Sequence, residues 1–238
     1  MEVWEILLIV GFTAAGATIH ASVGLGIGLV AGPALIVIDP GFLPGPMILA
    51  AMFLTARHLL VDGRHCERGT VTRAFIGVPV GLAVGVAVVA MADEDAMRLV
   101  VGCAIVLAAG LLLSGLRLRR STRTDVAGGA AFAFSLIAAG IPGPAAAVAF
   151  SDLEPPVYRG TMGFLGIPVS IVSLVLLAAA GEFGRDELEL VAWMLPGVAV
   201  GLLAGRRVRP FLDRSWFRPA VLWIALLGGA AVVVRQLL

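Results

Sequence analysis

The stretch Gly24-Leu25-Gly26-Ile27-Gly28 places three glycines inside an uncharged run that extends from Ile6 to Ile38. A second stretch, Gly140-Ile141-Pro142-Gly143-Pro144, interrupts the uncharged run from Val126 to Ser151. Glycine and proline are the poorest helix formers, so each run is predicted to be a helix that is broken in its middle. In hydrocarbon an unpaired backbone group is costly, so such a break is tolerated only inside protein or beside a water-filled cavity.

The composition predicts an all-α polytopic membrane protein that lies in a lipid bilayer. Of the 238 residues, 60% are hydrophobic and only 14% are charged, and the mean hydropathy is +1.03. A helix needs about 20 apolar residues to cross the bilayer core. Several uncharged runs approach or exceed this length, and they cover Ile6–Ile38, Pro40–Ala56, Ala74–Ala92, Leu99–Leu116, Val126–Ser151, Gly160–Gly181, Leu190–Gly205 and Pro219–Val234.

The order of these runs predicts an internal duplication. The polar connector 117–125 separates residues 1–116 from residues 126–238, and each part begins with a broken run. In both parts a proline-containing link follows the broken run. Three further apolar segments come next, so each part holds about four hydrophobic segments. Transporters are commonly built from such repeats, with the binding site at the broken segments. We therefore expect two transmembrane repeats joined by a basic cytoplasmic linker at 117–125.

The charges predict that the two repeats have opposite orientations. All seventeen basic residues are arginine, and short cytoplasmic loops are enriched in basic residues. The link that holds Arg57, Arg64, Arg68 and Arg73 corresponds to the acidic link 182–189 of the second repeat. Eight plain crossings would divide the arginines ten to seven between the two sides. If each broken run enters and returns to the same side, the division becomes fourteen to three. Eight plain spans with a few misplaced arginines stay the alternative.

The breaks are candidate anion sites, because the start of a helix piece presents unpaired N–H groups and a positive dipole end. Nearby polar residues could bind the same anion, and an imidazole or carboxylate could couple a proton to transport. Substrate contact is predicted for Gly24, Gly26, Gly28, His20, Ser22, Gly140, Pro142, Gly143, Ser135, Arg57, Arg159 and Thr161, and coupling for His20, Asp39 and Asp152.

Each of these residues also has a structural interpretation. The glycines could serve close helix packing, and His20 could be a neutral histidine bonded to a carbonyl group. Arg57 and Arg159 sit at segment ends, where arginine often anchors a helix to the membrane edge. Asp39 and Asp152 precede prolines and could be turn formers.

The chain resembles the TauE/SafE family of sulfite exporters, also called the toluene-sulfonate uptake permease family. The resemblance extends over nearly the whole chain in its hydrophobic layout, although Gly-Ile-Pro-Gly-Pro replaces a run of glycines in the second half. It implies a multi-pass carrier in the bacterial inner membrane that moves sulfite or small organosulfur anions such as sulfonates. The motifs that carry it are Gly11, Gly16, Gly24 to Gly28, Pro33, the link Pro40 to Pro46, Gly140 to Pro144 and Pro156.

The sequence argues against several other classes. No His-Glu-x-x-His motif, P-loop or clustered Cys and His ligands occur, so an enzyme, a metal site and a cofactor are not expected. No basic stretch interleaved with aromatics indicates nucleic-acid binding. The alternatives are a transporter or channel for another small solute, or a membrane scaffold protein without transport. The identity of the anion, the direction of transport and the oligomeric state, a homo-oligomer included, stay open at this stage.

Overall fold

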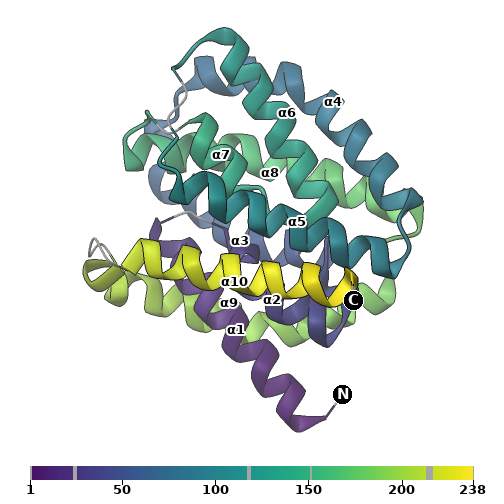
Figure 1. Cartoon of the computed structure of the whole chain (residues 1–238). Coiled ribbons are helices and arrows are strands. Elements are labelled where there is room, and N and C mark those ends of the chain that lie inside the picture. The colour runs from purple at the N-terminus through teal and green to yellow at the C-terminus, as the bar shows by residue number, and fades with distance from the viewer. Residues whose placement is uncertain (1, 24–25, 117–118, 151, 213–216, 238) are drawn as a thin grey trace.

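The computed structural model describes residues 2–23, 26–116, 119–150, 152–212 and 217–237, and within them every regular element is helical (Figure 1). The elements in chain order are α1 (Val3–Val23), α2 (Gly28–Ile38), η1 (Pro40–Phe42), α3 (Gly45–Asp62), η2 (Gly63–His65), α4 (Arg68–Met91), α5 (Glu94–Leu113), α6 (Thr122–Ala139), α7 (Gly143–Ala149), α8 (Pro155–Ala180), α9 (Arg185–Leu212) and α10 (Phe217–Leu237).

Within the described residues, seven helical stretches are long and apolar enough to cross a membrane: α1, α3 with its flanking 3₁₀ turns, α4, α5, α8, α9 and α10. Large apolar side chains cover their outer faces, and Leu60, Met91 and Leu203 are among the most exposed. In a soluble protein such a surface would be an aggregation hazard, whereas lipid tails satisfy it. The prediction of an all-helical polytopic membrane protein is confirmed.

Both predicted breaks are present. In the first broken run α1 ends at Val23 and α2 begins at Gly28, and in the second α6 ends at Ala139 and α7 begins at Gly143. Gly26 has a φ of +95° and Gly140 a φ of +66°, which is the left-handed region that side chains disfavour. Gly140 therefore ends α6 as its left-handed cap. Gly24 and Leu25 lie outside the described residues.

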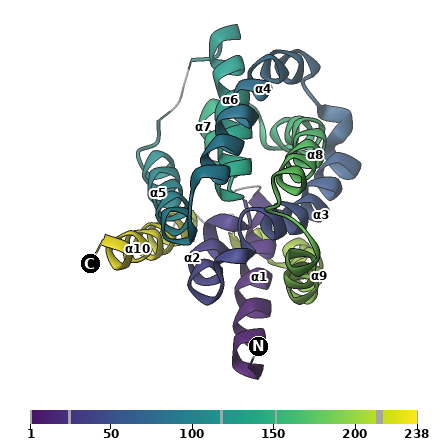
Figure 2. The ribbon, with the colours of Figure 1, turned by 90° about the vertical axis from the view of Figure 1, so that its right-hand side faces the viewer.

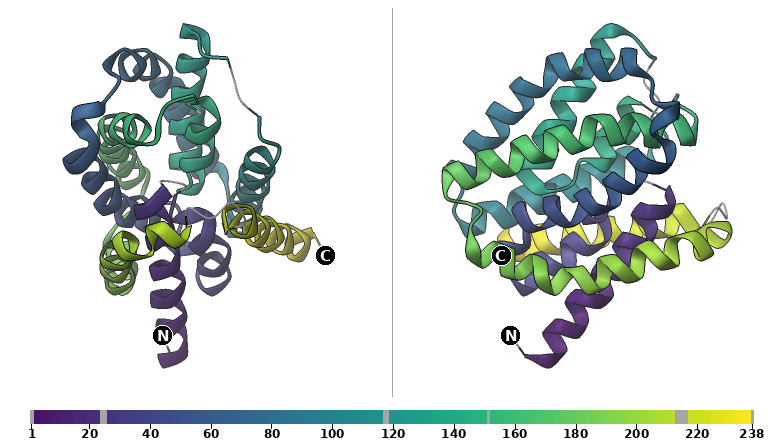
Figure 3. Two further views of the ribbon diagram at one scale, coloured as in Figure 1. Left: turned by 90° about the vertical axis from the view of Figure 1, so that its left-hand side faces the viewer. Right: turned by 180° about the vertical axis from the view of Figure 1, so that it is seen from behind.

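Each broken run folds back on itself as a hairpin. In Figures 1 and 3, α1 begins at the end of the bundle where the acidic links lie, and α2 returns to that same end. Helices α6 and α7 make the corresponding hairpin from the opposite end, which we call the basic end; there α4, α6, α8 and α10 begin. We call the other the acidic end; there α1, α3, α5 and α9 begin.

Ion pairs hold three connections together at the basic end. Arg120, before α6, pairs with Glu67 before α4 and lies 3.7 Å from the carboxylate of Asp152 before α8. Arg73 of α4 donates to the buried carboxylate of Asp125 in α6 over 2.7 Å. Arg120 has a raised pKa, and although burial opposes this shift, the hydrogen bond and the charge of Glu67 outweigh it.

Small residues bring two helix pairs into close contact. Helix α4 packs along α6, and α9 packs along α1. On α4 a Cβ added at Gly81 would lie 2.1 Å from the Ala130 carbonyl oxygen, and on α9 one at Gly201 would lie 2.3 Å from the Ala17 Cβ. Without a hydrophobic driving force between helices in lipid, such close backbone approach is a main source of packing energy.

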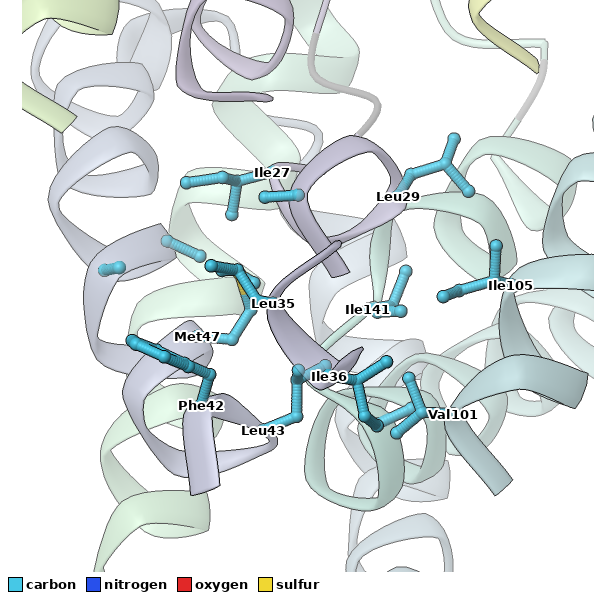
Figure 4. Packing of buried hydrophobic residues seen from close by; sticks show 14 of the residues in the cluster. Ile27, Leu29, Leu35, Ile36, Phe42, Leu43, Met47, Val101, Ile105 and Ile141 are labelled. Atoms are coloured by element: carbon cyan, nitrogen blue, oxygen red, sulfur yellow. The ribbon is translucent and has the colours of Figure 1, made fainter. Parts of the chain in front are cut away.

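The two hairpins occupy the middle of the molecule. In Figure 2, α5 with α10 and α3 with α8 flank them on opposite sides. Figure 4 shows Ile141, from the second break, among apolar side chains of α2 and α5, including Leu29 and Ile105. The second break is therefore inserted into the hydrophobic cluster that the first hairpin forms.

Candidate functional site

The two breaks, more than 100 residues apart in the chain, meet at one place. A Cβ added at Gly28 would lie 2.8 Å from the Ile141 Cγ1 and 3.1 Å from the Gly140 carbonyl oxygen. Beside this contact lies a cavity of about 40 Å³, large enough for a few water molecules. Its lining residues come from both halves of the chain: His20, Gly26, Ile27, Ala51, Thr55, His58, Phe132, Leu136, Gly140, Pro142, Ala146, Tyr158, Met162, Gly166 and Ser170.

Two stacked histidines form the polar wall of this cavity. His20 of α1 and His58 of α3 have ring centroids 5.3 Å apart and ring planes inclined by 7°. His20 is 8% exposed and His58 is 2% exposed. They come together because α1 ends at the first break while α3 passes beside it.

Three of the four imidazole nitrogens have no hydrogen-bond partner among the described residues. These are Nδ1 and Nε2 of His20 and Nε2 of His58, whereas the remaining nitrogen of His58 bonds to the backbone of Ala21. Buried polar atoms are almost always paired, because an unpaired one has lost its water without compensation. The three nitrogens are therefore groups that a bound solute, water or proton would satisfy.

The rest of the lining is mostly apolar with a few hydroxyl groups. Thr55, Tyr158 and Ser170 supply hydroxyls, and Phe132 and Met162 supply apolar walls. None of the lining residues described is a carboxylate. A small cavity with few polar groups is the usual form of a small-molecule site. Within the described residues, no three His, Cys, Asp or Glu side chains cluster closely enough to hold a metal ion.

Several predicted site residues lie at this cavity. His20, Gly26, Gly140 and Pro142 line it, and Gly28 packs directly against the second break. Gly143 is the first residue of α7. The two breaks therefore lie together beside one cavity. A role in substrate binding stays a prediction for each of these residues.

The predicted serines and threonine lie elsewhere. Ser22 donates to the carbonyl groups of Thr18 and Gly205, so its hydroxyl faces α9. Ser135 donates to the carbonyl oxygen of Ala131, one turn earlier in its own helix, over 2.7 Å. Thr161 accepts a hydrogen bond from the backbone N–H of Glu67 and ties α8 to the link before α4.

The two predicted arginines are already engaged. The guanidinium of Arg159, 6% exposed, donates to both carboxylate oxygens of Asp62 over 2.7 and 3.3 Å. Arg57 donates to the Ala21 carbonyl over 3.4 Å, next to the histidines. Arg159 therefore joins α8 to α3, and neither arginine is among the residues that line the cavity.

The predicted coupling carboxylates are remote from the cavity. The carboxylate of Asp39 accepts from the Gly41 N–H over 2.8 Å and so caps the turn at the end of α2. Asp152 has an exposed side chain near Arg120 at the basic end. These positions suit the turn-forming alternative, and of the three coupling candidates His20 alone is a lining residue.

Sequence reasoning did not place His58, Thr55 or Tyr158 among the site residues. All three lie near segment ends, as Arg57 and Arg159 do, and nothing in the linear pattern separates residues that face inward from those that face lipid. The feature that identifies His58 as a site residue is its stacking on His20, the one histidine of a broken run, where α3 packs beside α1. This contact depends on tertiary packing.

Of the comparisons with known proteins, the one with protein families gives a match. No curated protein and no solved structure matches the chain. A family model, sulfite exporter TauE/SafE, matches residues 7–232 and thus nearly the whole chain. This confirms the predicted resemblance and the interpretation as a transporter rather than an enzyme. The chain belongs to the TauE/SafE family of sulfite exporters.

Proposed function

We propose that this protein is a secondary transporter of sulfite or small organosulfur anions, sulfonates in particular, and that it works by alternating access around the cavity between the two breaks. The observation that carries the proposal is the meeting of both breaks at a cavity where three of the four histidine ring nitrogens lack partners among the described residues. Broken helices that converge on one cavity from two halves are typical of transporter binding sites.

An anion suits this cavity better than a cation. An imidazole N–H of His20 can donate to an oxyanion oxygen, and the described lining residues include no carboxylate. Helix α2 begins at Gly28 without a side-chain cap from Ile27, so its first N–H groups and its positive dipole end favour negative charge. A compact oxyanion can therefore be held by neutral donors.

We infer that residues 1–116 and 126–238 are inverted-topology repeats. Helices α1 to α5 correspond in order to α6 to α10, each set opening with a broken hairpin, although α6 begins at Thr122, inside the stretch predicted to be the linker. The packing has the same correspondence: α1 with α9 matches α6 with α4, and α3 with α9 matches α8 with α4. With the arginine-rich links at one end, the basic end faces the cytoplasm of a bacterial inner membrane.

Alternating access requires that the halves separate at one end at a time. At the basic end, three arginines make four ion pairs that bridge residues of different halves or the linker: Arg159 with Asp62, Arg73 with Asp125, and Arg120 with both Glu67 and Asp152. These contacts favour a state that is closed toward the cytoplasm. We expect that opening on that side breaks some of them.

A panel of anions tests the substrate. Purified protein is heated in the presence of sulfite, thiosulfate, sulfate, methanesulfonate, acetate and chloride, and its melting temperature is measured. A ligand that binds the native state at one hundred times its Kd adds about 2.7 kcal/mol to the free energy of unfolding. We expect a selective rise with sulfite or methanesulfonate. A rise with acetate alone would mean that the substrate is a carboxylate rather than a sulfur anion. No rise with any anion would favour the alternative of a membrane scaffold protein without transport.

Proteoliposomes separate a carrier from a channel. Vesicles preloaded with unlabelled methanesulfonate should accumulate labelled methanesulfonate transiently, because a carrier exchanges one molecule for another across the membrane. A channel would instead let both gradients decay independently, without accumulation. This result would keep the anion site and overturn alternating access.

A larger side chain at the contact between the breaks should strongly reduce transport. In Gly28→Leu the added side chain meets Ile141 and the Gly140 carbonyl group, so we expect at least a ten-fold loss of methanesulfonate exchange. Gly11→Leu in α1 is the matched control, since no heavy atom lies within 4 Å of a Cβ there. If the Gly28→Leu protein is obtained in unchanged yield and exchanges methanesulfonate normally, the contact between the breaks has no part in the transport mechanism.

A further inference from the structure

We infer that His20 and His58 act as one proton-binding unit, which carries a single proton across the membrane together with each anion. The inference rests on the proposed transport of an anion through the cavity and adds its coupling ion. Its central observation is geometric: two buried imidazole rings are stacked in parallel at a cavity that both breaks line, and three ring nitrogens have no partner among the described residues.

A purely structural role does not account for this arrangement. Structural histidines in protein interiors are held by hydrogen bonds at their ring nitrogens. His20 has no such bond among the described residues, and stacking leaves its N–H groups directed away from His58 rather than toward it. The rings are therefore placed against each other and against the cavity, with free sites for a proton and for an oxyanion.

The charged groups around the pair are occupied by other contacts. On α3, Asp62 is bound by Arg159 of α8, and Arg57 donates to the backbone of Ala21. Tyr158 of α8 is the other ionisable side chain among the described lining residues. The first break contributes Gly26 and Ile27 to the lining, α6 contributes Phe132 and Leu136, and α9 presents Gly201 and Gly205 to α1. No carboxylate among the described lining residues thus competes with the substrate anion for the positive charge that a proton gives the pair.

The separation of the rings limits the pair to one proton. Two imidazolium charges with centroids 5.3 Å apart would repel each other strongly in mostly apolar surroundings. One proton gives the cavity a single positive charge, which a monovalent sulfur anion neutralises. The proton and the anion then cancel each other's charge, and a loaded site that gains no net charge changes conformation in hydrocarbon surroundings at the lowest cost.

This electrostatic balance makes the transporter a proton–anion symporter. On loading, a solvent proton adds to one imidazole nitrogen and the anion accepts hydrogen bonds from the pair. On release at the other face, the proton returns to solvent when the anion leaves. Neither species is expected to cross alone, because each alone would add a net charge to the cavity.

Methanesulfonate is the probe for the test, since it keeps one negative charge at all pH values near neutrality. Proteoliposomes are made with the unaltered protein, His20→Gln, His58→Gln and the control His65→Gln, which changes the remaining histidine, an exposed residue of η2. Two quantities are measured: exchange of labelled methanesulfonate at equal pH, and its net accumulation when only the outside is acidified. A weakly buffered solution of purified protein reports proton uptake on binding.

We expect the unaltered protein and His65→Gln to accumulate methanesulfonate at least ten-fold under the pH gradient and to take up about one proton for each anion bound. His20→Gln and His58→Gln should lose gradient-driven accumulation and proton uptake. Exchange at equal pH should also fall in them, since the anion would enter the cavity without a balancing proton.

Failure of the coupling and failure of the transport function have different signatures. If the unaltered protein exchanges methanesulfonate but neither responds to the gradient nor takes up a proton, symport by the histidine pair is overturned while anion transport stands. If it exchanges no anion at all, the proposed function falls first. Gradient-driven accumulation that survives in both glutamine variants places the proton elsewhere, and it too overturns the inference. Should a variant fail to fold, the proton uptake of the unaltered protein still decides whether binding is coupled to a proton.

Discussion

Replacing Arg159 by alanine is expected to lower the free energy of unfolding by about 3–5 kcal/mol, one of the two largest effects of any single substitution proposed for this chain. Arg159 is 6% exposed and its partner Asp62 is 9% exposed, so the change leaves a carboxylate buried without its counter-charge. The bidentate geometry at 2.7 and 3.3 Å adds two hydrogen bonds to that loss. Denaturant unfolding in detergent, followed by circular dichroism, measures the change.

The paired substitution separates an unpaired charge from lost packing. Arg159→Met combined with Asp62→Leu removes both charges and keeps much of the side-chain volume. Because a buried ion pair is often no more stable than apolar residues of similar size, the double variant should recover most of the loss. A double variant as unstable as Arg159→Ala would show that the position matters for its shape alone. Restored stability without methanesulfonate exchange would place the pair in the transport cycle.

The second large effect concerns the close contact of α4 with α6. In Gly81→Ala the new Cβ would lie 2.1 Å from the Ala130 carbonyl oxygen and 2.9 Å from the Phe134 backbone nitrogen. Since both atoms belong to the backbone, the two helices must separate along their contact, and we expect a loss of about 3 kcal/mol in the free energy of unfolding. The melting temperature and the elution profile of the purified protein report it.

A glycine on an open helix face provides the control. Gly110 lies within α5 and has no heavy atom within 4 Å of an added Cβ, so Gly110→Ala should leave stability unchanged or raise it by up to about 1 kcal/mol through helix propensity. If Gly81→Ala behaves like Gly110→Ala, the approach of α4 to α6 is looser than described and small residues are not what holds the pair.

The sequence predicted the breaks because their cause is local. Glycine and proline clustered at residues 24–28 and 140–144 strongly disfavour an uninterrupted helix, and both interruptions occur there. Apolar runs likewise predict spanning helices, since hydrocarbon requires every backbone group to be paired within its own segment. The family resemblance followed from the same features, and the match over residues 7–232 confirms it.

The site residues were less accessible to such reasoning. Ser22 and Ser135 are close to the breaks in the chain, yet their hydroxyls bond to backbone carbonyls away from the cavity. Arg159 carries the charge that oxyanion binding suggests, yet it is bound by Asp62. In each case proximity along the chain or chemical type was a poor guide, because the direction of a side chain on a helix depends on which neighbours the helix packs against.

The sequence by itself determined that this protein is a helical membrane protein with two interrupted segments, because hydropathy and helix breaking act over a few residues. Only the tertiary structure decided that the interruptions meet, with Gly28 against Gly140 and Ile141. It also decided that His20 of α1 stacks on His58 of α3 beside that contact. The physical reason is that long-range contacts arise from the joint packing of all ten α-helices described, through glycine-lined interfaces such as α4 with α6, and no local pattern encodes that arrangement.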